Sequence, residues 1–106
     1  MGIKTKKWDL ADYLEDPEDI AVYLNMVLED GDAGEIAYAI GAVARSKGMT
    51  RIAKETGLSR EGLYGSLSSD GNPTLSTLLK VLAACGTRLR VEPVKTHDEA
   101  LTQAQG

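Results

Sequence analysis

The sequence predicts an all-α domain of about five helices followed by one short C-terminal β-strand. Three observations support this fold class. Apolar residues recur at intervals of three and four over most of the chain, as they do on one face of a helix. Residues that favour helix ends stand at the borders of these stretches. One stretch near the C-terminus alternates polar and apolar residues, which is typical of a strand.

Length and composition favour a single domain with short tails, because the chain has 106 residues of which 42% are hydrophobic. The core is expected to be aliphatic, since the chain has no Phe and one Trp. No apolar run approaches the roughly 20 residues of a membrane span, and no signal peptide is evident. A single cysteine excludes an internal disulfide framework. We therefore expect a cytoplasmic protein without a membrane segment.

Charge is distributed unevenly along the chain, although the net charge is only −4. Residues 9–35 carry ten acidic side chains and no Lys or Arg, whereas residues 36–95 carry nine basic and four acidic side chains. A phosphate backbone senses the local charge within a Debye length. We divide the chain into an acidic leader with a basic tip, residues 1–32, a helical body ending in the strand, residues 33–94, and a disordered tail, residues 95–106.

The leader begins with a short helix, which we expect over Asp9–Leu14, and continues in a longer helix. Asp16 and Pro17 form a strong helix start, because Asp caps the first turn and Pro suits the first helical position. This second helix is expected to run to about Glu29. Its apolar stripe consists of Ile20, Tyr23, Leu24, Val27 and Leu28.

The body begins with a helix over Ala33–Lys47, which carries an apolar face and ends at Gly48. Gly41 lies inside this helix, where it costs about 1 kcal/mol relative to Ala and indicates close approach of another helix.

The segment Met49–Leu67 is the one around which the rest of the chain is organised. It contains two short helices joined by a tight turn, with Thr50 and Ser59 as the expected N-caps and Gly57 in the turn. The apolar residues that hold the turn on the core are Ile52, Ala53, Leu58, Leu63 and Leu67. This pattern is that of a helix-turn-helix, whose second helix enters the DNA major groove.

A loop over residues 68–73 leads to a last helix, which Thr74 caps and which runs to about Cys85. Its inward-facing residues are predicted to be Leu75, Leu78, Leu79 and Leu82. Residues 87–94 then alternate as a strand does, with Leu89 and Val91 on one face. A lone strand leaves its backbone edge unpaired, which favours pairing with a second copy or with a partner's sheet. The alternative is a self-packed or disordered tail.

Three stretches carry a specific resemblance: KTKKWDLADYLEDPEDIAVYLNMVLEDGD, GMTRIAKETGLSREGLYGSLSSDGNPTLSTLLKVLAACG and the terminal strand. Together they resemble Xre-family addiction-module antidote proteins, the HigA-type antitoxins with a lambda-repressor-like helix-turn-helix. The resemblance covers residues 3–94 and implies a cytosolic homodimer that neutralises a RelE/ParE-like toxin and represses its own operon. Members tend to carry a larger polar or basic residue where this chain has Gly62 and Gly65. These glycines weaken the second helix or permit close approach of its backbone to DNA.

Candidate site residues follow from this arrangement. The DNA-binding candidates are exposed residues of the helix-turn-helix and the next helix start, namely Arg51, Lys54, Ser59, Arg60, Glu61, Tyr64 and Thr74. The candidates for contact with a basic toxin are the leader residues Tyr13, Ile20, Tyr23, Leu24 and Val27. Leu89 and Val91 are the candidates for dimerisation. The alternatives are ordinary surface charges on the helices and a leader that packs on its own body.

Catalytic chemistry has little support in the sequence. His97 lies in the polar tail, and Cys85 lies at the end of a Leu-rich helix, where a buried thiol acts as a small apolar group. No metal-ligand spacing or phosphate-binding glycine loop is present, so we expect no enzyme activity, metal or cofactor. Two functions besides the antitoxin remain open, a stand-alone Xre-family repressor without a toxin and an interaction module that no longer binds DNA.

Overall fold

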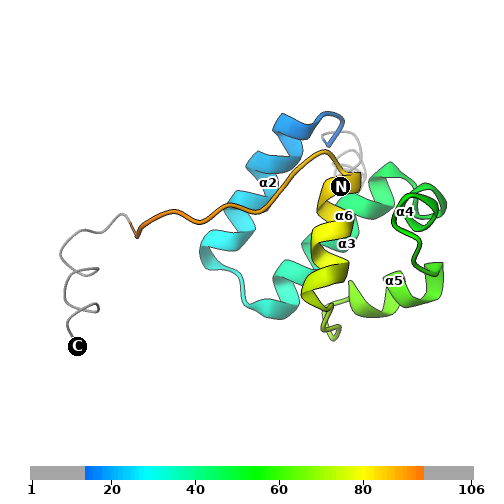
Figure 1. Cartoon of the computed structure of the whole chain (residues 1–106). Coiled ribbons are helices and arrows are strands. Elements are labelled where there is room, and N and C mark those ends of the chain that lie inside the picture. The colour runs from blue at the N-terminus through cyan, green and yellow to red at the C-terminus, as the bar shows by residue number, and fades with distance from the viewer. Residues whose placement is uncertain (1–13, 95–106) are drawn as a thin grey trace, which may run out of the picture.

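The computed structural model describes residues 14–94, which fold into a bundle of five α-helices (Figure 1). In chain order the helices are α2 (Pro17–Asp30), α3 (Ala33–Lys47), α4 (Met49–Thr56), α5 (Arg60–Ser66) and α6 (Leu75–Ala84). α3 lies at the centre of the bundle and contacts each of the other four helices. The predicted all-helical fold is confirmed for the described residues. The short helix expected over Asp9–Leu14 lies almost wholly outside them.

Most helix starts are fixed by the capping side chains that the sequence predicts. Asp16 accepts the backbone N–H of Asp19 at 2.9 Å, and Thr74 accepts that of Thr77 at 3.1 Å. α3 begins with a capping box that the sequence analysis missed, in which Asp32 and Glu35 accept each other's backbone N–H at 2.8 and 2.9 Å. These bonds satisfy donors that a helix leaves free in its first turn.

The Thr50 cap is the exception, and that prediction was wrong. α4 begins at Met49, two residues before the start that a Thr50 cap implies, and its N-cap is Gly48, which makes no side-chain cap hydrogen bond. Gly48 has a φ of 100°, a conformation that glycine adopts readily and that lets α4 follow α3 after a single residue.

The hydrophobic core joins all five helices, and it includes the leader helix. Ile20 and Leu24 of α2 are buried in the same cluster as Val43 of α3, Ile52 of α4 and Leu63 of α5. Lys47 adds a polar link, because its Nζ donates to the Glu15 carbonyl oxygen at 2.9 Å. The leader is therefore part of the body's core as far as the structure describes it.

Two predicted apolar faces differ from those in the structure. Leu75 and Leu79 of α6 were expected to point inward, but Leu75 is 63% exposed and Leu79 is also exposed. Val81, which was not predicted, is fully buried in α6 beside Leu82. Leu28 of α2 is likewise exposed. In each case the 3–4 spacing identified a helix but did not identify which face meets the neighbouring helices.

Residues 87–94 leave the bundle as an extended segment that starts beside the first turn of α2 (Figure 1). This described segment forms no β-strand in the single chain, so the predicted C-terminal strand is not shown. A strand requires a second edge to accept and donate its backbone hydrogen bonds, and the described helices offer none.

Candidate nucleic-acid interface

The turn between α4 and α5 is held by side-chain and backbone hydrogen bonds. Gly57 is left-handed, with φ 77° and ψ 15°, and its N–H donates to the Ala53 carbonyl oxygen at 2.9 Å. Thr56 donates its hydroxyl to the Ile52 carbonyl at 2.7 Å and accepts the N–H of Leu58 at 3.3 Å. The sequence analysis missed this role of Thr56, although a Thr in the last turn of a helix often bonds the carbonyl four residues earlier.

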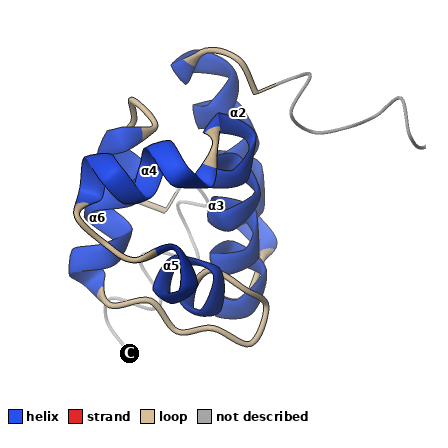
Figure 2. Cartoon of the chain, turned by 90° about the vertical axis from the view of Figure 1, so that its right-hand side faces the viewer, coloured by secondary structure: helices blue, strands red, loops and turns tan. Residues whose placement is uncertain are grey.

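α5 is packed on one face and free on the other (Figure 2). Leu63 and the following Leu67 are fully buried, and Ser59 caps the helix by accepting the Gly62 N–H at 2.9 Å. The predicted side chains on the other face are all exposed, namely Ser59, Arg60, Glu61 and Tyr64. α4 and α5 are therefore two short helices joined by a tight turn, as the sequence predicts, and one face of α5 is exposed.

Arg60 is positioned by its neighbour one turn later. Its guanidinium carbon lies 5.9 Å from the centroid of the Tyr64 ring, and both residues are exposed. A stack of this kind restricts the guanidinium plane while it leaves the N–H groups free to donate. Arg60 therefore lies on the exposed face of α5 with its guanidinium close to the Tyr64 ring.

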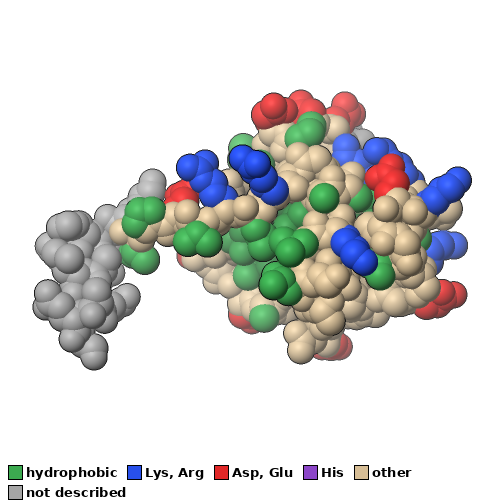
Figure 3. Space-filling view, viewed as in Figure 1, with side chains coloured by type: hydrophobic (Ala, Val, Ile, Leu, Met, Phe, Trp, Pro, Cys, Tyr) green, Lys and Arg blue, Asp and Glu red, His purple; other side chains and the backbone are tan. Residues whose placement is uncertain are grey.

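α4 supplies the remaining basic candidates. Arg51 Nε lies 2.9 Å from Glu55 Oε2, and both side chains are largely exposed. An exposed pair of this spacing contributes at most about 1 kcal/mol, so a phosphate can replace the carboxylate at low cost. Lys54 is exposed on the same helix. Figure 3 shows Lys and Arg side chains on the side of α4, whereas Asp and Glu gather over the start of α2.

Thr74 is exposed, but its hydroxyl is already used within the chain. Its Oγ1 accepts the Thr77 N–H at 3.1 Å and lies 3.1 Å from the Thr77 hydroxyl. The structure thus places Thr74 as the cap of α6, and a phosphate contact there remains a prediction.

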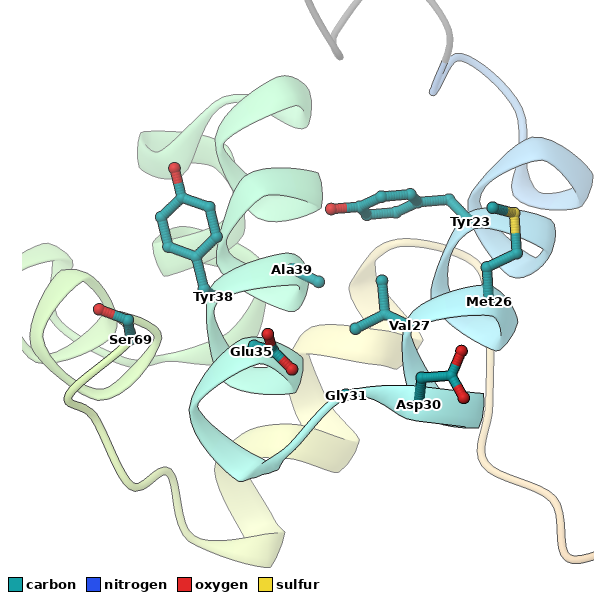
Figure 4. A pocket seen from close by; sticks show the side chains of 9 residues that line it. All are labelled: Tyr23, Met26, Val27, Asp30, Gly31, Glu35, Tyr38, Ala39 and Ser69. Atoms are coloured by element: carbon teal, nitrogen blue, oxygen red, sulfur yellow. The ribbon is translucent and has the colours of Figure 1, made fainter.

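The predicted toxin contacts in the leader are divided by the packing of α2. Ile20 and Leu24 are buried in the chain's own core, so neither side chain is accessible to a partner in this conformation. Tyr23 and Val27 are partly exposed and line a groove between α2 and α3 (Figure 4). Tyr13 lies outside the described residues. The alternative that the leader packs on its own body thus holds for two of the five side chains.

The predicted dimerisation residues, Leu89 and Val91, are both exposed on the extended segment, and Val91 is 94% exposed. Such exposure leaves them free for contact with a second copy. Whether they pair is not tested by the single chain.

Cys85 has no features of a nucleophile. Its side chain is buried, and this burial raises the pKa of the thiol, which keeps it protonated near neutral pH. Within residues 14–94 no group of three His, Cys, Asp or Glu side chains could hold a metal ion. None of the described helices combines the length and apolar character needed to cross a bilayer.

Comparison with known proteins assigns the family. A family model described as "probable addiction module antidote protein" matches residues 4–93. The chain belongs to this antidote family. An uncharacterized protein of Haemophilus influenzae is 41% identical to the antidote over 92 residues, which are 87% of this chain and 95% of the relative. No solved structure matches the chain.

Membership has two consequences for the antidote. An addiction module antidote acts on a toxin, so a toxin is the partner that the family implies. Antidote proteins are also typically non-enzymatic.

Proposed function

We propose that this antidote is a cytoplasmic antitoxin that binds a RelE/ParE-like toxin and represses its own operon by binding operator DNA as a homodimer. The observation that carries the DNA-binding part is the exposed face of α5. Its start is fixed by the Ser59 cap, and Arg60 and Tyr64 are exposed beside the basic side chains of α4. This is the arrangement through which helix-turn-helix proteins enter the major groove.

Each predicted residue has a role in this proposal. Arg60 donates to the O6 and N7 atoms of guanine, and Glu61 accepts from the N4 amino group of cytosine. Arg51 and Lys54 contact phosphates and set the register of α5 on the duplex. Tyr64 holds Arg60 in place and contacts a phosphate or a thymine methyl group.

The homodimer presents two copies of α5 to successive major grooves about 34 Å apart. Leu89 and Val91 support this part, because they are exposed at alternate positions of an extended segment with a free backbone edge. Pairing of the two 87–94 segments would bury both side chains and satisfy the edge.

Toxin binding is supported by charge. The region from residue 9 to residue 35 has no basic side chain, and a toxin of the RelE/ParE-like kind is basic. Complementary charge speeds the encounter of two proteins and favours the correct pair. The proposal therefore places the toxin on the side of α2, away from the basic side chains of α4.

The DNA-binding proposal is tested with Arg60→Ala on the upstream promoter region of this gene in a gel shift. Loss of a bidentate base contact is worth about 1–3 kcal/mol, so the affinity should fall roughly 5-fold to 150-fold. Arg45→Ala is the matched control, because Arg45 also stacks on a tyrosine, 5.3 Å from the centroid of Tyr38, but lies on α3. Equal affinity of the Arg60→Ala variant and the wild type would remove Arg60 from the interface.

Co-expression with a small basic protein encoded beside this gene, followed by pull-down, tests the toxin. A chain that binds its promoter but no such protein would be a stand-alone repressor. A chain that binds the basic protein but not DNA at any salt concentration would be an interaction module, since DNA binding should strengthen as salt is lowered.

A further inference from the structure

An open groove of about 500 Å³ lies between the C-terminal half of α2 and the N-terminal half of α3 (Figure 4). Tyr23, Met26 and Val27 line it from α2, and Tyr38 lines it from α3. In Figure 4 the Tyr23 ring reaches from α2 toward α3, while Tyr38 stands on the other side of the opening. The rings of Tyr23 and Tyr38 thus stand on the two sides of the groove, with Val27 between them.

Two of the apolar side chains that line this groove are exposed. Met26 is 66% exposed and Tyr38 is 51% exposed. Contiguous exposed apolar surface of this kind commonly marks an interaction site. Methionine and tyrosine suit such a site, because Met adapts its shape to different partners and Tyr supplies a large, rigid contact area.

The rim of the groove is acidic at the α2–α3 junction, whereas at the other wall Arg45 stacks on Tyr38, with its guanidinium carbon 5.3 Å from the ring centroid. Asp30 and Glu35 line it at the junction of α2 and α3, and the Glu35 carboxylate is held in place by the Asp32 N–H at 2.9 Å. This rim lies in the part of the chain that has no Lys or Arg between residues 9 and 35. A nucleic acid is disfavoured here, because its phosphates would be repelled, whereas Lys and Arg side chains would be attracted.

We propose that this α2–α3 groove binds a basic amphipathic segment of the toxin. One or two apolar side chains of that segment enter between Tyr23 and Tyr38 and cover Met26, and its Lys or Arg side chains face Asp30 and Glu35. The inference rests on the proposed function, since it assigns the surface through which the antidote recognises its toxin. Among the predicted toxin-contact residues, the buried Ile20 and Leu24 are thereby exchanged for the exposed Met26 and Tyr38.

A second copy of this chain is the competing occupant. Residues 87–94 are themselves basic and amphipathic, with Arg88 and Arg90 beside Leu89 and Val91. The toxin is favoured because residues 87–94 begin beside Pro17 and Glu18, at the opposite end of α2 from the groove. Self-association is measured in the same experiment to separate the two occupants.

The test measures the affinity of the full chain for the basic protein encoded beside its gene, by calorimetry, with substitutions inside and outside the groove. Met26→Lys should weaken binding about tenfold or more, because it places a charge on the apolar lining that α2 contributes beside Tyr23. Val22→Lys is the matched control: Val22 lies one turn earlier on α2 and is 60% exposed, but it does not line the groove. That variant should bind like the wild type.

The acidic rim is tested separately by a pair of adjacent residues. Asp30→Asn removes a rim carboxylate, whereas Glu29→Gln removes its neighbour, which does not line the groove. Both changes neutralise one charge in the last turn of α2, so their effects on the helix are matched. Asp30→Asn should lower the affinity more, and the difference should shrink as salt is added.

Four results would overturn the inference. If Met26→Lys binds the basic protein as tightly as the wild type does, the groove inference fails but the proposed antitoxin function does not. Equal losses in Met26→Lys and Val22→Lys would also overturn it, because the effect would then not belong to the groove. A Met26→Lys variant that loses self-association but keeps the basic protein would assign the groove to a second copy. Absence of binding by the wild type would overturn both the inference and the proposed toxin binding.

Discussion

Gly41 and Gly65 both lie inside helices, but their surroundings differ. A Cβ atom at Gly41 would collide with the Leu67 carbonyl oxygen and lie 3.1 Å from the Leu67 Cβ, so the absence of a side chain lets α3 approach the end of α5. A Cβ atom at Gly65 would meet nothing within 4 Å. Packing within the chain therefore explains why residue 41 is a glycine, but it does not explain the glycine at position 65.

This contrast predicts opposite effects of the same substitution. Gly65→Ala should raise the free energy of unfolding by about 0.5–1 kcal/mol, because alanine restricts the unfolded chain and favours the helix. Gly41→Ala should lower it by about 1–3 kcal/mol, because the new methyl group overpacks the contact with Leu67. Denaturant unfolding of both variants measures the difference.

A gel shift with the Gly65→Ala variant adds information on function. A more stable protein that binds its promoter less tightly would mean that the bare backbone of α5 lies against DNA. A Gly65→Ala variant no more stable than the wild type would contradict the account of α5 as an ordinary helix with a free outer face.

At the scale of elements, α2 and α6 each carry apolar side chains on two faces. On α2, Ile20 and Leu24 face the core while Val22 and Met26 face solvent. On α6, Val81 faces the core while Leu75 and Leu79 do not. The number of apolar residues in these helices exceeds what one buried face can hold, and the surplus lies on the surface.

α2 therefore offers a test of which face stabilises the fold. Ile20→Ala should lower the free energy of unfolding by about 2–4 kcal/mol, because it leaves a cavity in the core. Val22→Ala should change it by less than about 0.5 kcal/mol, because Val22 is exposed. Thermal or denaturant unfolding separates the two. Equal effects would contradict the orientation of α2.

Local signals explain which elements were predictable. Asp16, Ser59 and Thr74 mark helix starts by their own hydrogen-bonding chemistry, and Gly57 marks the turn, so these borders follow from a few adjacent residues. The exposed face of α5 was also predicted correctly, because all of its residues belong to one short segment. The choice between Leu79 and Val81 depends on where α4 lies, and a single helix does not contain that information.

The α2–α3 groove was predictable only in part, because its lining comes from two helices. Tyr23 and Val27 were identified because they lie on the apolar stripe of α2. Met26 and Tyr38 were missed, since one lies off that stripe and the other comes from the next helix. Only the crossing of α2 and α3 brings them together.

At the scale of the whole molecule, α2 shares one hydrophobic core with the other described helices. Ile20 and Leu24 pack in one cluster with residues of α3, α4 and α5, and Cys85 at the end of α6 belongs to the same cluster. Acidic and basic surfaces are therefore held by one folded unit, with the acidic side on α2 and the basic side on α4.

The burial of Cys85 in this core gives the stability a dependence on pH. Its thiol pKa is raised in the folded state, so above the ordinary pKa the unfolded chain ionises while the folded chain does not. The unfolded state then binds fewer protons, and the free energy of unfolding falls as pH rises. Between about pH 8 and 10, this decline should be steeper for the wild type than for Cys85→Ala.

Denaturant unfolding at a series of pH values measures these two slopes. The smaller side chain of Cys85→Ala lowers the free energy of unfolding at every pH. It therefore shifts the whole curve and does not change how steeply the curve falls with pH. Parallel curves for the two proteins would show that the thiol titrates alike in the folded and unfolded states, contrary to its burial.

The short link between α2 and α3 carries a further consequence. A single proteolytic cut at Gly31 would separate α2, with the core residues Ile20 and Leu24, from the rest of the chain. The two walls of the groove would then belong to different peptides. Degradation at one bond would thus end folding and recognition together. An occupant spanning both helices would shield that bond from a protease.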